Sequence, residues 1–100
     1  MAAAIILEFE GVDRSMYEAV NSKLGIDMAT GAGDWPAGMQ THLAGTTDDG
    51  GLMVVEVWES REKQAAFMTS RLGAAIADSG VPAPVRITWL DVLAQHTSPG

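Results

Sequence analysis

The order in which strand-like and helix-like segments follow one another limits the fold of this chain more than any other feature. Branched and apolar residues, partly alternating with polar ones, predict strands at residues 4–10, 39–45, 52–59 and 85–93. Apolar residues at helical spacing predict one helix between the first two strands and another between the last two. An Asp-Gly turn at 46–51 connects the two middle strands. Residues 26–38, with three glycines and a proline, are predicted to form a long loop.

Capping residues set the bounds of both predicted helices. Ser15 and Glu18 fit a capping box at the start of the first helix, and Gly25 is suited to end it. Ser60 is a good N-cap for the second helix, which runs to about Asp78. The predicted buried faces are Met16, Tyr17, Val20 and Leu24 in the first helix, and Phe67, Met68, Leu72 and Ile76 in the second, with Ala65 and Ala75 allowing close approach.

The resulting order β-α-β-β-α-β is that of the ferredoxin-like fold, in the α+β class. This fold has a four-stranded antiparallel sheet with two helices on one face. A chain of 100 residues with 47% hydrophobic and 19% charged residues has the size and composition of one folded domain. We therefore predict a single domain over residues 1–100, with its core at about 4–93 and a flexible tail at 94–100.

Composition excludes several classes of function. The absence of cysteine excludes disulfides, cysteine nucleophiles, thiolate zinc sites and cysteine-ligated iron–sulfur clusters. A net charge of −7 repels a phosphate backbone, so we expect no nucleic-acid partner. The apolar residues 1–7 are followed at once by Glu8 and Glu10 and are too few to cross a bilayer. We expect a cytoplasmic protein with no membrane partner.

Alternation along the strands predicts which side chains face the helices. The sets predicted to contact the helices are Ile5, Leu7 and Phe9, then Met39, Thr41 and Leu43, and then Met53, Val55 and Val57. The sets predicted to lie on the other face include Glu8, His42, Leu52, Val54, Glu56 and Trp58. The last strand is apolar on both faces, and Arg86 and Thr88 join the uncovered face if Ile87 and Trp89 contact the helices. A β-bulge in a strand would reverse its assignment.

The face without helices would expose an apolar patch larger than a monomer usually carries. Pairing this face with its own copy across a two-fold axis buries the patch. We therefore predict a homodimer in which two sheets meet as an α/β barrel. The partly polar interior of such a barrel is the predicted pocket for a small molecule.

Two stretches of the chain resemble a known superfamily. They are Val55-Glu-Val-Trp-Glu-Ser-Arg-Glu62 and Pro36-Ala-Gly-Met-Gln-Thr-His42, the latter followed by Ala44-Gly45. With the order and spacing of elements over 4–93, they resemble the dimeric α/β-barrel superfamily that includes the antibiotic-biosynthesis-monooxygenase-like proteins.

The resemblance implies a homodimer that binds aromatic or planar substrates. Its cofactor-independent members oxidise activated phenolic rings with a Trp at the end of the third strand, matched here by Trp58. Arg86 lies where the family's Arg can lie, whereas Tyr17 and Asn21 match no family role by position. The second helix has no His and the first strand carries Glu8, so the resemblance does not extend to haem degradation.

Six residues are the candidate site, and four of them have a structural alternative. His42 is the candidate general base, or it bonds to Glu8 or Glu56 to complete the interface. Glu56 orients His42 or pairs with Arg86. Trp58 stacks on a ligand or packs at the dimer interface. The remaining candidates are Glu8 and Arg86, as substrate contacts, and Trp35, which closes over the pocket or anchors its loop.

Two functions fit these observations. The first is a cofactor-independent monooxygenase or related acid/base enzyme acting on a small aromatic or polyketide-like molecule. In it His42 deprotonates a phenol or enol and the carbanion reacts with oxygen, so we expect no cofactor. We also expect no metal, since one His and two Glu without ligand spacing make a weak metal site. The second is a non-catalytic dimer, either a stress-responsive small-molecule-binding protein or an accessory module.

Overall fold

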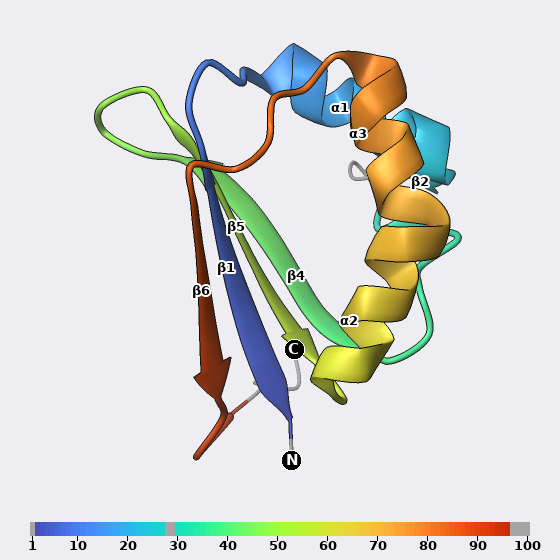
Figure 1. Cartoon of the computed structure of the whole chain (residues 1–100), viewed down its shortest axis with the longest axis vertical. Coiled ribbons are helices and arrows are strands. Elements are labelled where there is room, and N and C mark those ends of the chain that lie inside the picture. The colour runs from blue at the N-terminus through green and yellow to red at the C-terminus, as the bar shows by residue number, and fades with distance from the viewer. Residues whose placement is uncertain (1, 28–29, 97–100) are drawn as a thin grey trace.

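The computed structural model describes residues 2–27 and 30–96, which form an antiparallel sheet with helices on one face (Figure 1). The sheet strands are β1 (Ala3–Phe9), β4 (Met39–Thr46), β5 (Leu52–Trp58) and β6 (Arg86–Asp91). Their order is β4-β5-β1-β6, and every neighbouring pair is antiparallel. This connectivity confirms the predicted ferredoxin-like fold.

The first helix, α1 (Arg14–Leu24), begins two residues earlier than a Ser15 cap would allow. Asp13 is its N-cap, and its Oδ1 accepts a hydrogen bond of 2.9 Å from the backbone N–H of Met16. The predicted capping box of Ser15 and Glu18 is therefore wrong. The predicted C-terminal stop is confirmed, because Gly25 has the left-handed backbone (φ 77°) that ends many helices.

The second helical segment covers the same face of the sheet and runs without a break through α2 (Arg61–Phe67), η1 (Met68–Leu72) and α3 (Gly73–Ser79), as Figure 1 shows from the side. Ser60 caps it as predicted, accepting from the N–H of Lys63 at 3.3 Å. The middle part, η1, is a π-helical turn in which the N–H of Gly73 bonds to the carbonyl of Met68. A Cβ on Gly73 would lie 2.9 Å from that oxygen, so glycine permits this close approach. Ala75 is buried as predicted, but Ala65 is exposed.

The face assignment of β5 is opposite to the predicted one. Leu52, Val54, Glu56 and Trp58 pair with Phe9, Leu7, Ile5 and Ala3 of β1, and all of these residues are buried beneath the helices. Residues directly opposite one another share a face, so Met53, Val55 and Val57 lie on the uncovered face. Both sets are apolar, which is why alternation alone did not decide between them.

The face assignment of β4 also changes, because the register shifts between Met39 and Thr41. Met39 pairs with Trp58 and His42 with Glu56, so this irregularity places Met39 and His42 on the helix face. Leu43 pairs with Val55 on the uncovered face, where it is half exposed. The expected orientation is confirmed for Met39 and wrong for Leu43.

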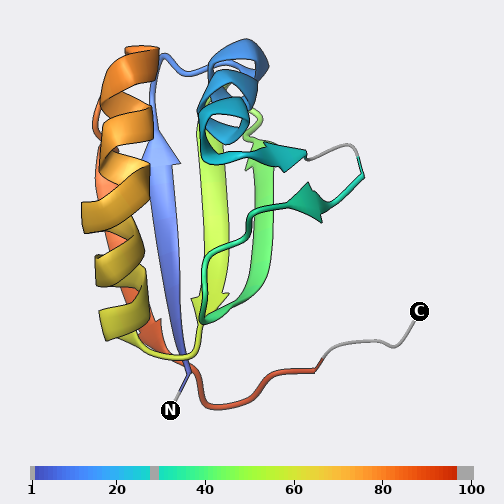
Figure 2. The ribbon, with the colours of Figure 1, turned by 90° about the vertical axis from the view of Figure 1, so that its right-hand side faces the viewer.

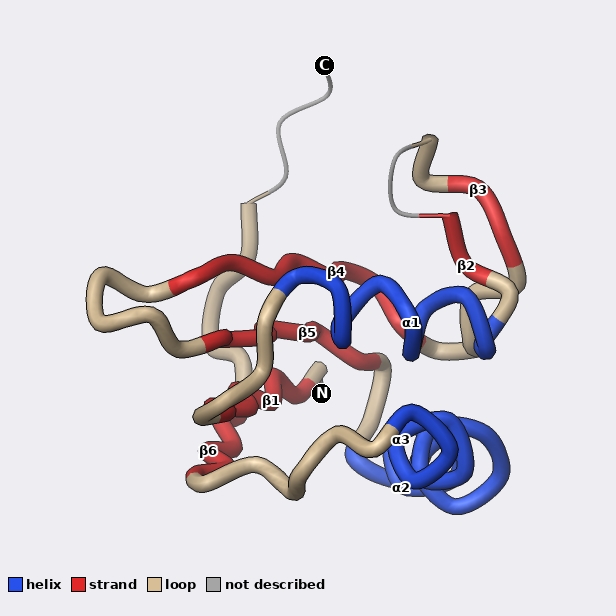
Figure 3. Tube along the Cα trace, turned by 90° about the horizontal axis from the view of Figure 1, so that it is seen from above, coloured by secondary structure: helices blue, strands red, loops and turns tan. Residues whose placement is uncertain are grey.

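The strand β6 follows the first of its two predicted orientations. Ile87 and Trp89 pair with Leu7 and Ile5 on the helix face, while Arg86 and Thr88 pair with Glu8 and Ile6 on the uncovered face. The uncovered face is thus lined by Ile6, Leu43, Met53, Val55, Val57, Thr88 and Leu90, with Arg86 3.7 Å from Glu8 at one end. Within residues 2–27 and 30–96, no helix packs on this face (Figures 1 and 3).

The segment predicted as a loop contains a small hairpin of two short strands, β2 (Ile26–Asp27) and β3 (Ala32–Gly33). The hairpin follows α1 and stands out from the body of the domain on the side of β4 (Figure 2). Ile26 at its start and Trp35 just after its end line the space between the sheet and the helices.

Candidate functional site

The candidate site begins with a cross-strand pair on the helix face of the sheet. His42 of β4 lies directly opposite Glu56 of β5, and the His42 Nδ1 atom is 3.0 Å from Glu56 Oε2. The two side chains are only 9% and 5% exposed. A buried carboxylate needs such partners, because burial without them is costly.

Two further side chains extend this pair into a chain of hydrogen bonds. The Tyr17 hydroxyl on α1 is 2.6 Å from His42 Nε2, with the two rings nearly parallel, and the Trp58 indole N–H donates to Glu56 Oε1 at 3.0 Å. We call Tyr17, His42, Glu56 and Trp58 the polar chain. It connects residues that are up to 41 positions apart in sequence, from Tyr17 to Trp58.

The partners of His42 fix which of its nitrogens carries the proton in the neutral ring. A carboxylate only accepts hydrogen bonds, so the Nδ1 facing Glu56 is the N–H. Nε2 then accepts the hydroxyl proton of Tyr17. The site therefore has a carboxylate, an imidazole and a hydroxyl in a row. In catalytic sites of this order the carboxylate orients the imidazole, and the imidazole takes a proton from the hydroxyl.

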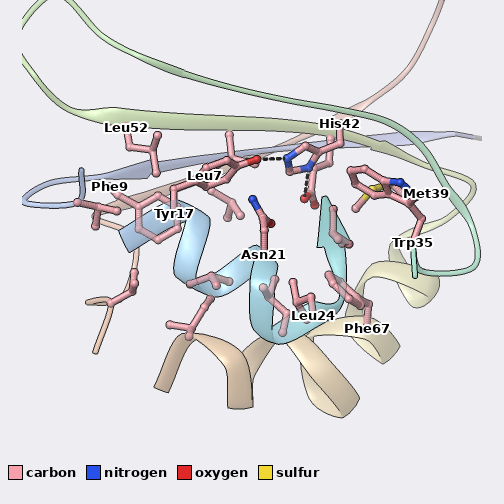
Figure 4. A pocket seen from close by; sticks show the side chains of 18 residues that line it. Leu7, Phe9, Tyr17, Asn21, Leu24, Trp35, Met39, His42, Leu52 and Phe67 are labelled. Carbon is pink, nitrogen blue, oxygen red and sulfur yellow. Dashed lines mark hydrogen bonds and ion pairs between the residues drawn. The ribbon is translucent and has the colours of Figure 1, made fainter. Parts of the chain in front are cut away.

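A cavity of about 60 Å³ lies between the sheet and the helices, and the polar chain reaches it (Figure 4). Four of the side chains that line it are polar, namely Tyr17, Asn21, His42 and Glu56. The others are apolar and come from β1, α1, β2, β4, β5 and the second helical segment, and from the connecting residues Val12, Trp35 and Val81. An apolar cavity with a few converging polar groups is the usual form of a small-molecule site.

Asn21 lies one helical turn after Tyr17 on α1, and its amide reaches toward the sheet beside Tyr17 and His42 (Figure 4). Asn21 is buried, and its Nδ2 makes no hydrogen bond within the described residues. Burial raises the pKa of Tyr17 above its ordinary value of 10.0, the neighbouring Asn21 amide opposes that rise, and the charge of Glu56 adds to it. The cavity thus holds a neutral phenol, and within the described residues the neighbouring Asn21 Nδ2 reaches no acceptor at hydrogen-bond distance.

Trp35 forms part of the cavity wall, as one of its predicted roles requires. Its ring centroid is 5.6 Å from that of His42, and its indole N–H donates to the Gly31 carbonyl at 2.9 Å. Arg71 of the π turn holds this segment in place, because its guanidinium donates to the carbonyls of Leu24 at 2.8 Å and of Asp34 at 2.7 Å. Trp35 therefore both lines the cavity and is anchored.

Three of the predicted site residues do not lie in this cavity. Trp58 is fully buried and contacts Phe67 and Glu56, so neither face of its ring is free to stack on a ligand. Glu8 and Arg86 point to the opposite face of the sheet and pair with each other. The expected pairing of Glu56 with Arg86 is wrong for the same reason. The cavity described here lies within one chain, and the pocket expected inside a barrel of two sheets stays a prediction.

Tyr17 and Asn21 are the site residues that the sequence interpretation missed. Tyr17 was expected only to pack, and Asn21 was given no role. A signal was present, because Asn21 falls on the same helical stripe as Tyr17 and Leu24, at spacings of four and three residues. A polar residue on an apolar stripe indicates a partner or a site within the core.

The described residues contain neither a group of metal ligands nor a membrane-spanning helix. Among residues 2–27 and 30–96, no three His, Asp or Glu side chains are grouped as metal ligands would be. Within the same ranges, no helix has the length and apolar character needed to cross a bilayer.

Comparisons with known proteins identify the fold. No protein-family model matches the chain, and no curated protein matches it either. Solved structures do match over nearly its whole length. A protein from Mycobacterium tuberculosis has a TM-score of 0.69 at 22% identity, covering 97% of this chain and 100% of its own. A candidate antibiotic biosynthesis monooxygenase from Chloroflexus aurantiacus has a TM-score of 0.68 at 15% identity, covering 97% and 98%.

Another candidate antibiotic biosynthesis monooxygenase, from Deinococcus radiodurans, has a TM-score of 0.56 at 13% identity and covers 99% of this chain and 98% of its own. At such identities the similarity shows the fold and does not show the activity. The chain has the ferredoxin-like fold of the antibiotic-biosynthesis-monooxygenase-like structures, and the resemblance seen in its sequence is confirmed at that level.

Proposed function

We propose that this protein is an acid/base enzyme that acts on a small aromatic or polyketide-like molecule bound between its sheet and its helices. The reaction we favour is monooxygenation without a cofactor. One observation carries the proposal, which is the buried Glu56–His42 pair whose imidazole meets a hydroxyl at the wall of an apolar cavity. The fold similarity to two candidate monooxygenases agrees with it.

In the proposed reaction His42 serves as the proton acceptor of the site. Loss of a proton from a phenol or enol leaves an anion whose charge is delocalised onto carbon. Glu56 stabilises the imidazolium that forms, and Trp58 holds Glu56 in position through its N–H. The carbanion then reduces molecular oxygen, so that a CH₂ carbon becomes a carbonyl while the second oxygen atom leaves as water.

The volume of the cavity bears on how a substrate binds. A cavity of about 150 Å³ holds one benzene molecule, whereas the cavity here is about 60 Å³. A ring-shaped substrate therefore has to displace part of the wall. We propose that the Trp35 side chain swings aside, because it is only half-buried and is held by its hydrogen bond to the Gly31 carbonyl, whereas Arg71 holds the backbone at Asp34.

The uncovered face of the sheet supports the proposal of a homodimer. Apolar side chains from all four strands lie on it, and Leu43 and Leu90 are 54% and 48% exposed. Covering this surface with a second copy removes it from water. The dimer interface and the cavity then lie on opposite faces of each sheet.

A cysteine-free chain suits a reducing compartment, and we propose the cytoplasm.

The test is oxygen uptake with anthrone, a tricyclic compound with an acidic CH₂ group. His42→Gln keeps a donor toward Glu56 but cannot hold the proton, so we expect the rate to fall roughly 100-fold or more. His96→Gln makes the same change at an exposed histidine and is the matched control. Equal rates for the wild type and His42→Gln would rule out the role of His42.

A non-catalytic binding protein is the second candidate. It is favoured by the fact that His42 and Glu56 already have partners inside the protein, as a purely structural network would. Under this function the wild type would bind aromatic ligands and consume no oxygen with any of them.

A further inference from the structure

The capacity of His42 for hydrogen bonds limits what it can touch. Its Nδ1–H is used by Glu56 and its Nε2 lone pair by the Tyr17 hydroxyl. An imidazole has no third polar site. In this arrangement a substrate cannot reach a free nitrogen of His42 without displacing Tyr17.

Tyr17 does have capacity left. A phenol group offers one O–H donor and two oxygen lone pairs. His42 accepts from the O–H, and it uses neither lone pair. Next to it the Asn21 amide is a buried donor with no hydrogen bond among the described residues. One ligand hydroxyl group is able to complement both, donating its proton to the Tyr17 oxygen and accepting from Asn21 Nδ2.

We infer that the Tyr17 oxygen is the atom that receives the substrate's proton, while the proton of Tyr17 passes to His42 Nε2. The inference rests on the proposed function and names the residue that touches the substrate in it. The O–H bond of the substrate and that of Tyr17 break, and a new Tyr17 O–H and an Nε2–H form. The electron pair stays on the substrate oxygen, where Asn21 donates to it.

The electrostatics of the site agree with a relay of this kind. Tyr17 is neutral before and after the transfer, and its raised pKa disfavours a free tyrosinate. The net change places a positive charge on His42, directly beside the carboxylate of Glu56. The negative charge arises on the ligand, next to the unpaired donor of Asn21. The substrate class is therefore one with an acidic hydroxyl, a phenol or an enol.

The test uses two ligands of nearly equal shape, 4-nitrophenol and 4-nitrotoluene, with affinities measured by calorimetry. The wild type is expected to prefer the phenol, and Tyr17→Phe to reduce that preference roughly 2- to 10-fold, as loss of one hydrogen bond does. Affinity for the methyl compound should stay the same. Phe9→Leu, which alters an apolar part of the wall, should change both affinities equally.

Proton transfer is read from the visible band of the 4-nitrophenolate anion, at a pH where the free ligand is neutral. The wild type should show the band, and Tyr17→Phe should lose the band and show the reduced preference for the phenol. His42→Gln should lose the band but retain part of the preference. A band that survives in Tyr17→Phe, an unchanged preference, or a wild type that binds neither ligand would each overturn the inference. Phenol binding through Tyr17 without oxygen uptake on anthrone would instead uphold it and refute the proposed monooxygenase.

Discussion

Replacing Trp58 by Phe tests whether this residue belongs to the core rather than to a ligand site. The indole is fully buried, packs on Phe67, and donates to Glu56 Oε1 at 3.0 Å. Phe keeps an aromatic ring but removes the N–H. The Glu56 oxygen is then left unpaired in the interior, which costs about 1–3 kcal/mol. The smaller ring leaves a void that adds roughly 1 kcal/mol.

We therefore expect Trp58→Phe to lower the free energy of unfolding by about 2–4 kcal/mol. Small domains have about 5–15 kcal/mol in total, so the variant should still fold. Urea denaturation followed by circular dichroism measures the change, with the slope against denaturant expected to stay constant. Trp89→Phe is the matched control, because Trp89 is only half-buried. Arg61 contacts the face of the Trp89 ring, and a phenyl ring keeps such a face. Its expected cost is below about 1 kcal/mol.

A double-mutant cycle isolates the hydrogen bond from the packing. In a Glu56→Leu background the indole N–H has already lost its acceptor, so Trp58→Phe should cost at least about 1 kcal/mol less than in the wild type. If Trp58→Phe costs the same in both backgrounds, or no more than Trp89→Phe, the reasoning about the polar chain is wrong.

Three other predictions follow from the same geometry. Tyr17 is the only tyrosine of the chain, so its ultraviolet absorbance should titrate with a midpoint above 10.0 in the folded protein and near 10.0 in urea. The stability that this raised pKa gives the folded protein is complete below pH 10.0 and is lost as the pH rises toward the folded midpoint. Asn21→Leu should raise the free energy of unfolding by about 1 kcal/mol, because it removes an unpaired buried amide, and should weaken ligand binding in calorimetry. Leu90→Lys should convert a dimer to monomers in sedimentation velocity, while Leu93→Lys, at a residue 93% exposed, should not.

Much of the fold could be predicted from local sequence alone. The strand order along the chain, the hairpin turn, the Ser60 cap and the Gly25 stop depend on a few neighbouring residues, and the structure has all of them. The capping of α1 was also a local question, but two sets of good capping residues lay within three positions. The side chain of Asp13 makes the bond, and Ser15 lies inside the helix.

The position of the site could not be predicted in this way. The sequence left open whether His42 pairs with Glu8 or Glu56, and the structure pairs it with Glu56; both residues had been placed on the wrong face of the sheet. Both faces of β5 are apolar apart from Glu56, so periodicity gave no reason to bury the glutamate. Its burial is stable only because Trp58 and His42 supply donors, and the second of these comes from another strand.

The sequence by itself determined which elements form, because helix and strand periodicities and caps act over a few residues. The tertiary structure decided which side chains share an interior. The register irregularity in β4 turned His42 inward, and α1 brought Tyr17 and Asn21 against it from 25 and 21 positions away. A hydrogen-bond chain of this kind forms only where the packing of the elements places donors opposite acceptors. That information lies in the fold as a whole and not in any one segment.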